Sequence, residues 1–186
     1  YDIKQLPDTP AFKADLQNLF VVVELGDHHA TLLDGDSFTP IHRFQTRFAL
    51  HGGPKYSPDG RFVYFASRDG WISKFDIYNL KTVAEIRAGI NTRNMAVSFD
   101  GRYAMVANYL PHNLVLLDTE NLTPIKVIPV EGRVSAVYTA PPRNSFVAAL
   151  KDSKTILEIP YREPFPTLII PTETYLDDFF FDQEYN

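Results

Sequence analysis

Short runs of apolar residues alternate along the chain with turns rich in Gly, Asp and Pro, and no window shows a convincing helical period. Asp59-Gly60 and Asp100-Gly101 are strong tight-turn signals, because glycine accepts a positive φ without a Cβ clash. Four runs rich in Val, Phe, Tyr and Ala have the composition of buried strands; they are 19–25, 61–67, 103–108 and 145–150. The pattern predicts an all-β fold of short strands joined by hairpins.

The chain also contains an internal repeat. Three segments superpose without gaps around Asp34, Asp76 and Asp118, at intervals of 42 residues. A second marker, Ser-Pro-Asp-Gly-Arg-Phe at 57–62, returns as Ser-Phe-Asp-Gly-Arg-Tyr at 98–103 and is echoed at 181–185, with Pro-Pro-Arg in the intermediate place. A unit of about 40–45 residues with four strands is the signature of a propeller blade. The repeated acids are expected to form Asx-type turns and to report fold rather than chemistry.

The repeat length divides the 186 residues into a little over four blades. We expect an N-terminal lead-in segment over 1–18 and a partial β-propeller over 19–186. A ring of about four blades is possible, but the first half of a larger ring, cut within a blade, fits the last residues better. The start at a Tyr instead of Met indicates a processed chain or a fragment. Half a ring exposes strand edges, so self-association or pairing with the rest of the propeller is expected.

Composition excludes several classes of protein. An apolar fraction of 45% argues against a disordered chain, and no apolar run approaches the roughly 18 residues of a membrane span. The net charge of −5 comes from an acidic segment at 173–186 after a charge-balanced body, which argues against a nucleic-acid partner. The absence of Cys removes disulfides, thiolate metal sites and covalent c-type haem attachment.

His51 is the histidine with the most suggestive setting. It stands in Arg47-Phe-Ala-Leu-His51-Gly-Gly-Pro, before the tight turn at 57–62. The two glycines leave space for close approach by a flat ligand. The first strand of a propeller blade lines the central channel, and a neutral imidazole is a common haem iron ligand. These residues alone are also compatible with a histidine that is packed in the protein and binds no ligand.

Arginines and a loop complete the candidates. Arg47, Arg68 and Arg93 lie near predicted strand ends, and arginine suits a bidentate grip on carboxylates; a surface or intrablade ion pair is the alternative for each. Tyr109 and His112 lie where a longer loop replaces the usual acidic turn. This loop is either a channel-rim element over a ligand or a plain hairpin.

The segment 47–72, together with Ile90-Asn-Thr-Arg93-Asn-Met, resembles the haem d1-binding propeller of the cytochrome cd1 nitrite reductase family. The resemblance runs from about residue 16 to the end of the chain. It implies about four blades of an eight-bladed haem d1 propeller, with His51 as the axial ligand of the haem iron. It also implies that Arg68 and Arg93 face the carboxylates of the macrocycle, and it suggests the same role for Arg47. The family's cytochrome c domain, which carries haem c, would lie outside these residues.

Within the family, the sequence at 22–35 and 48–54 is most similar to that of a maturation dehydrogenase of haem d1 biosynthesis. This resemblance implies a periplasmic oxidoreductase of denitrification that oxidises a propionate of dihydro-haem d1 to the acrylate of haem d1. Tyr109 and His112 are the candidates for the catalytic base. A cytochrome c or nitrite reductase is the implied protein partner, and the fragment alone is expected to be inactive.

Two other functions remain open at this point. The haem d1 domain of a cytochrome cd1 nitrite reductase, which converts nitrite to NO, would have the same fold. The repeat at 113–125 also resembles those of non-enzymatic propellers that bind proteins on their rims.

Overall fold

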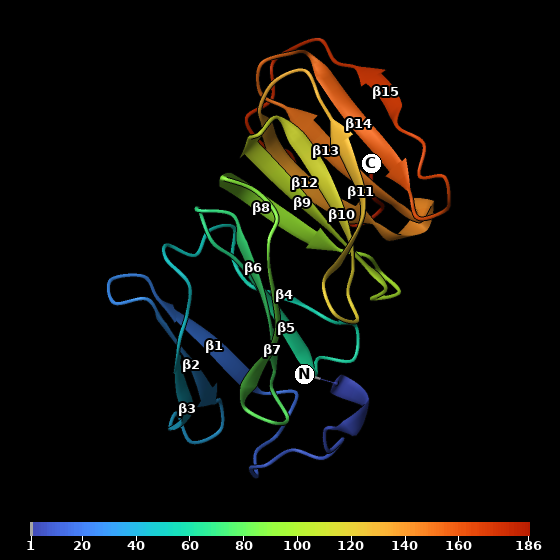
Figure 1. Cartoon of the computed structure of the whole chain (residues 1–186). Helices are drawn as coiled ribbons and strands as arrows, with labels where there is room; N and C mark the ends of the chain where they lie inside the picture. Colours follow the sequence, from blue (N-terminus) through green and yellow to red (C-terminus); the bar gives the residue numbers. More distant parts are fainter. Residues whose placement is uncertain (1) are drawn as a thin grey trace.

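The computed structural model describes residues 2–186 and consists of four antiparallel sheets placed one after another (Figure 1). Each sheet runs in sequence order from its first strand to its last. The first sheet holds β1 (Leu19–Glu24), β2 (His29–Asp34) and β3 (Pro40–Gln45). The second holds β4 (Lys55–Tyr56), β5 (Phe62–Ala66), β6 (Trp71–Asp76) and β7 (Lys81–Arg87).

The remaining two sheets have the same plan. The third holds β8 (Asn91–Val97), β9 (Tyr103–Leu110), β10 (Asn113–Asp118) and β11 (Thr123–Pro129). The fourth holds β12 (Val134–Ala140), β13 (Ser145–Leu150), β14 (Thr155–Pro160) and β15 (Leu168–Pro171). The helical elements within 2–186 are the short 3-10 turns η1 (Ile3–Gln5) and η2 (Pro141–Arg143), so the prediction of an all-β fold is confirmed.

The repeated aspartates close the same turn in successive sheets. Asp34, Asp76 and Asp118 each accept, at Oδ1, a hydrogen bond from the backbone N–H two residues further on, at 2.9, 3.0 and 2.8 Å. These are the Asx-type turns predicted from the repeat. The same turn therefore recurs at each 42-residue step of the repeat.

The second repeat marker also has a structural counterpart. Asp59 and Asp100 accept the backbone N–H two residues on, at 3.1 and 3.0 Å, and Asp182 accepts that of Glu184 at 2.8 Å. In the fourth sheet the turn is replaced by η2, with Asn144 in the left-handed region at φ 47°. The echo of the marker at 181–185 therefore shares the Asx-type bond, but its reverse turn runs from Asp182 O to Tyr185 N instead of ending at the residue after the aspartate.

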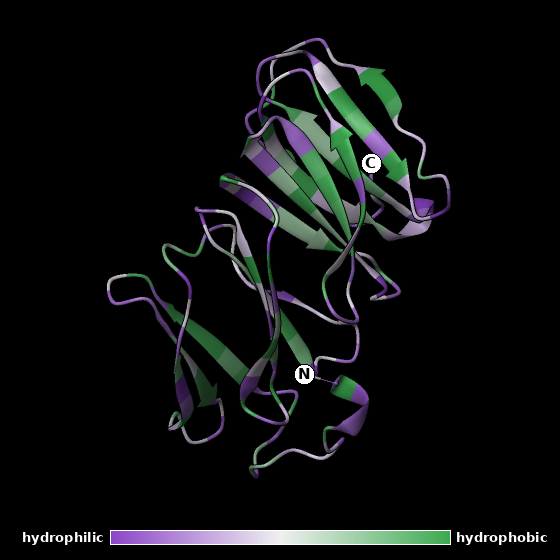
Figure 2. Cartoon of the chain, in the orientation of Figure 1, coloured by the Kyte–Doolittle hydropathy of each residue, from purple (hydrophilic) through white to green (hydrophobic). Residues whose placement is uncertain are grey.

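Three apolar clusters hold the sheets together, one between each pair of neighbours. Phe65 and Phe75 of the second sheet pack with Ala30 and Leu32 of the first. The second and third sheets share a cluster around Ile72 and Met95, and the third and fourth share one around residues of β10, β13 and β14. Apolar residues concentrate in the strands, whereas the connecting turns are largely hydrophilic (Figure 2).

The first strands of the sheets lie on a common inner side. β8 packs against β4 on one side and against β12 on the other. The first sheet differs, because Asp34 ends β2 as Asp76 ends β6, so β1 corresponds to β5 rather than to β4. Within the described chain, no strand pairs with the remaining edge of β1. No helix of residues 2–186 is long and apolar enough to cross a membrane.

Candidate functional site

The segment between β3 and β4 carries the predicted histidine and turns sharply beside it. Gly52 and Gly53 have φ values of 83° and 70°, a region that glycine enters without a Cβ clash. A Cβ on Gly52 would lie 2.4 Å from Asn94 Oδ1, so close packing against β8 requires glycine there. A Cβ on Gly53 would meet nothing within 4 Å. The space expected beside the two glycines is therefore open only at Gly53.

His51 is held from both sides of its ring. Its backbone N–H donates to Ala66 O at 2.8 Å, which fixes the main chain against β5. Its Nδ1 lies 2.6 Å from the backbone oxygen of Arg93, and its Nε2 lies 2.9 Å from Arg93 Nη1. A guanidinium can only donate, so Nε2 must accept and the ring proton must sit on Nδ1. The contacts therefore select the neutral imidazole with a lone pair on Nε2.

A polar pocket of 160 Å³ lies against this ring. Four of the residues singled out from the sequence meet there although they come from different elements: His51 before β4, Arg68 after β5, Arg93 in β8 and Tyr109 in β9. Asn91 and Thr92 complete the lining. The inner ends of two neighbouring sheets thus bring one imidazole, two guanidinium groups and one phenol together.

His51 also borders a larger, mainly apolar pocket of 420 Å³. Its other lining residues come from β1, from the glycine turn and from β5; they are Val21, Val23, Leu25, Leu50, Gly52, Gly53, Pro54, Phe65 and Ala66. Binding pockets for small molecules combine such an apolar wall with a few placed polar groups. The imidazole therefore stands at the boundary between an apolar wall and a cationic end.

Neither pocket arginine forms an ion pair with a carboxylate within residues 2–186. The Arg68 side chain is exposed. Arg93 is half-buried, and its Nε donates to Ser135 O at 3.3 Å. Two guanidinium groups without a carboxylate partner are a fitting receptor for an anionic ligand.

Two further cations near Tyr109 were missed in the sequence. Arg133 and Lys151 lie 5.5 and 5.9 Å from the centre of the Tyr109 ring. Each already has an acidic partner: Arg133 Nη2 lies 2.6 Å from Asp152 Oδ1, and Lys151 Nζ lies 2.5 Å from Asp177 Oδ1. The ammonium of Lys151 lowers the pKa of Asp177, and more distant attraction to Arg93 acts in the same direction. The rim of the pocket therefore carries two ion pairs that the sequence candidates did not include, and these add no net charge.

The repeat itself holds a signal that would have found another member of the site. His51, Arg93 and Ser135 follow one another at intervals of 42 residues, and the side chains of His51 and Arg93 each bond the backbone oxygen of the next. Ser135 Oγ in turn donates a hydrogen bond to the backbone oxygen of Leu176 at 3.0 Å, 41 residues further on. Counting the period from His51 would therefore have placed Ser135 on the inner side.

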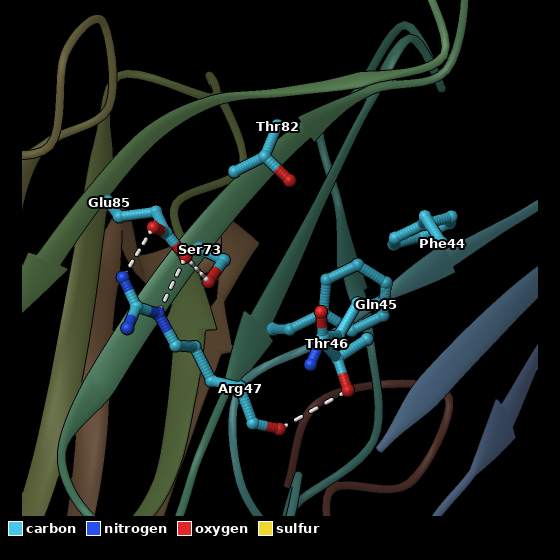
Figure 3. Close-up of a pocket in the computed structure, with 8 residues that line it drawn as sticks. Phe44, Gln45, Thr46, Arg47, Ser73, Thr82 and Glu85 are labelled. Atoms are coloured by element: carbon cyan, nitrogen blue, oxygen red, sulfur yellow. Dashed lines mark hydrogen bonds and ion pairs between the residues drawn. The ribbon is translucent and has the colours of Figure 1, made fainter. Parts of the chain in front are cut away.

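Arg47 lies in a different pocket, between the first and second sheets. Its Nε and Nη2 donate to Glu85 at 3.0 and 2.7 Å, and its guanidinium lies 3.9 Å from the centre of the Trp71 ring. Ser73 Oγ donates to the same Glu85 carboxylate (Figure 3). The structure thus gives Arg47 the intrablade ion pair named as its alternative, and does not bring it to His51.

His112 also lies outside the pocket. Its side chain is exposed in the turn between β9 and β10, and its backbone oxygen accepts from Val130 N at 3.1 Å. Arg133 holds the pKa of Asp152 well below its usual range, and His112 acts in the same direction. No group of three His, Cys, Asp or Glu side chains that could hold a metal ion occurs in the described part of the chain.

Comparison with known proteins gives a consistent family. The family model described as "Cytochrome D1 heme domain" matches residues 14–186. A dihydro-heme d1 dehydrogenase of Pseudomonas aeruginosa is 59% identical, covering 100% of this chain and 39% of the relative. A nitrite reductase of Stutzerimonas stutzeri is 31% identical over 74% of the chain, covering 26% of that protein. Protein NirF of Pseudomonas aeruginosa is 30% identical over 75% of the chain, covering 38% of that relative.

Solved structures agree with these sequence relationships. The structure of the dihydro-heme d1 dehydrogenase NirN in complex with DHE superposes with a TM-score of 0.96 at 60% identity, covering 100% of this chain and 42% of that one. The hydrazine synthase of Kuenenia stuttgartiensis shares the fold at 20% identity, with a TM-score of 0.66 over 76% of this chain and 42% of its own. The prediction of propeller blades is confirmed, and the chain spans about two fifths of the length of the first relatives it matches.

Proposed function

The chain belongs to the cytochrome D1 heme domain family, and from that premise we propose that it forms part of the ligand-binding propeller of a dihydro-haem d1 dehydrogenase. The observation that carries the proposal is the neutral imidazole of His51, whose Nε2 meets Arg93 in a pocket where neither arginine has an ion pair among residues 2–186. An identity of 59% to the dehydrogenase, against 31% to the nitrite reductase, supports haem d1 maturation over nitrite reduction.

The donor set fits a tetrapyrrole that carries carboxylates. An axial imidazole needs its other nitrogen bonded to a fixed acceptor, and the Arg93 backbone oxygen does this at 2.6 Å. The apolar pocket beside His51 would contact the face of the ring, and Arg68 and Arg93 would bind its carboxylates. The polar pocket of 160 Å³ is smaller than a ligand of this size requires, so the remainder of the ring would complete it.

The proposed reaction removes two electrons and two protons from a propionate side chain, which leaves the double bond of an acrylate. When bound, the macrocycle supplies the redox chemistry. His51 would ligate the iron through Nε2, and the arginines would hold the carboxylates in register. Tyr109 Oη is our proposed proton acceptor, because it is the phenol of the polar pocket that Arg68 and Arg93 also line. His112, which does not line the pocket, would take no part.

Three further elements complete the proposal. A cytochrome c, as a domain of the full protein or as a partner, would accept the electrons, and nitrite reductase would receive the finished cofactor. The protein would act in the periplasm, which a translocation-dependent reporter fused to the full protein would test by its activity on that side of the membrane.

The unpaired edge of β1 and the apolar strand β15 would contact the rest of the propeller. Ile169 is 73% exposed and Phe20 is 49% exposed, so both ends of the described sheets present apolar side chains to solvent. We expect this chain alone to self-associate, or to pair with the remaining blades when these are added. Light scattering that shows a persistent monomer would contradict this.

The test uses the full-length protein and dihydro-haem d1. His51→Ala should abolish the visible spectrum of the imidazole-ligated cofactor while circular dichroism remains that of the folded protein. His42→Ala is the matched control, because His42 stacks on Phe44 and Phe75 away from both pockets. An unchanged ligated spectrum in His51→Ala would overturn the assignment of the axial ligand.

A further inference from the structure

Arg93 makes two different contacts with the same histidine. Its backbone oxygen accepts the Nδ1 proton of His51, and its guanidinium donates to Nε2 at 2.9 Å. The first contact orients the ring for any ligand. The second covers the lone pair that an iron atom would need. The residue that prepares the axial nitrogen therefore also blocks it.

The blocking contact can be released without loss of the orienting one. The backbone of Arg93 is fixed in β8, and its Nε is anchored to Ser135 O at 3.3 Å on the next sheet. Only the terminal Nη1 atom holds Nε2. Rotation about the last side-chain torsions would withdraw the whole planar guanidinium, with loss of the long Nε bond to Ser135 O, and would leave the Arg93 carbonyl on Nδ1.

A carboxylate is the natural competitor for this guanidinium. A carboxylate can accept two parallel hydrogen bonds from a guanidinium and carries the opposite charge, whereas a neutral imidazole nitrogen accepts one and carries none. Among the described residues Arg93 has no ion pair, and the nearby Asp177 carboxylate is already bonded to Lys151. An incoming carboxylate would therefore find Arg93 available and bound to a weaker partner.

We propose that Arg93 is a latch that couples carboxylate recognition to axial ligation, an inference that rests on the proposed function of this site. A tetrapyrrole with a carboxylate in reach of Arg93 draws the guanidinium away and uncovers His51 Nε2. A tetrapyrrole without one must compete with Arg93 for the nitrogen. Arg93 is thus a specificity-determining residue, acting through His51 as well as on the ligand.

The latch predicts opposite effects on two ligands that differ only in their carboxylates. In Arg93→Met the backbone oxygen still orients His51, but Nε2 is uncovered. Binding of dihydro-haem d1 should weaken by up to about 10-fold, because the loss of one charge-assisted hydrogen bond, worth about 10- to 100-fold, is partly offset by a gain of about 10-fold from the uncovered Nε2. Binding of its methyl ester should tighten about 10-fold, because nothing competes for Nε2. Both affinities are measured by absorption titration of the full-length protein.

Arg68→Met is the matched control. It removes a cation from the same pocket, but Arg68 does not contact His51 in the described structure. It should weaken the acid ligand and leave the ester unchanged. An ester affinity that Arg93→Met leaves unchanged, or that both variants raise equally, would overturn the coupling.

A second measurement needs no cofactor and separates the latch from the proposed function. Diethyl pyrocarbonate acylates neutral imidazole nitrogens, so the rate of modification at His51, followed by peptide mass spectrometry, reports on the cover over Nε2. Arg93→Met should raise that rate at least about 10-fold relative to His42 in the same sample. Arg93→Gln, whose neutral amide can still donate, should give an intermediate rate.

The two results have distinct meanings. An unchanged rate at His51 in folded Arg93→Met refutes the latch whatever the protein binds. A faster rate combined with no binding of dihydro-haem d1 by the wild-type protein supports the cover over Nε2 and refutes the proposed function and the coupling built on it.

Discussion

Lys74 offers a prediction in which one buried charge sets the pH dependence of stability. Its side chain lies between the second and third sheets, and the residue is 4% exposed. Nζ donates to Thr119 O at 2.8 Å and to Glu120 O at 3.2 Å. Burial lowers the pKa of Lys74 from 10.5 to about 8, although nearby carboxylates, Asp76 first, act in the opposite direction. The folded state therefore holds this proton less tightly than the unfolded chain does.

The sign and size of the effect follow from proton linkage. Below about pH 8 the ammonium is protonated in both states, and the cost of burying it is present in full. Between about pH 8 and pH 10.5 the folded state has released the proton and the unfolded state has not, so the free energy of unfolding rises with pH. The rise should amount to about 2 kcal/mol from about pH 7.5 to about pH 9.5, and to about 3 kcal/mol in total.

The assay is urea denaturation of wild type and Lys74→Met across this range. Methionine has a similar length and no charge, so the variant should lack the rise. The unfolding free energy of the wild type should therefore increase by about 2 kcal/mol relative to that of Lys74→Met between about pH 7.5 and about pH 9.5. Taking this difference cancels the titration of the other groups. Lys13→Met, which removes an exposed ammonium, is the control and should leave the rise in place. A constant difference between wild type and Lys74→Met would refute the reasoning.

Two substitutions test the turns that define the blades. Gly70→Ala should lower the free energy of unfolding, measured by heat or urea, by about 3 kcal/mol or more, because φ is +95° and the new Cβ would lie 1.9 Å from a backbone oxygen. Gly26→Ala is the control and should lower it little, because its new Cβ would meet no atom within 4 Å. Asp76→Ala should cost about 3–5 kcal/mol, since it strands the Arg61 guanidinium that Asp76 binds at 3.0 Å. Asp118→Ala, which loses a backbone hydrogen bond, should cost about 1 kcal/mol. Equal losses for the two aspartates would contradict this account.

Much of the fold could be read from local chemistry. The Asx turns at Asp34, Asp76 and Asp118 depend on residues two positions apart, so their signal is complete within a short window. The strands between them follow from apolar runs bounded by those turns. The first sheet was harder, because the number of strands in a blade depends on which segment pairs with β1, and no local signal reports that.

The candidate site was predictable in part, for a related reason. His51, Arg68, Arg93 and Tyr109 stand at or beside the ends of strands whose repeat positions are known, so their convergence could be expected. The same argument placed Arg47 with them. The side chain of Arg47 instead follows the face of its own sheet to Glu85, because an opposite charge and the ring of Trp71 lie there.

By itself, the sequence determined the all-β class, the 42-residue blade and four of the residues that line the polar pocket, since these depend on turns and periods within one repeat. Only the tertiary structure decided which partner each side chain meets. The Arg93 contacts to both nitrogens of His51 join residues 42 positions apart on different sheets. Lys151 and Asp177 meet across 26 residues of the chain. Such contacts are set by how neighbouring blades pack, which is a property of the assembled sheets and not of any segment of the chain.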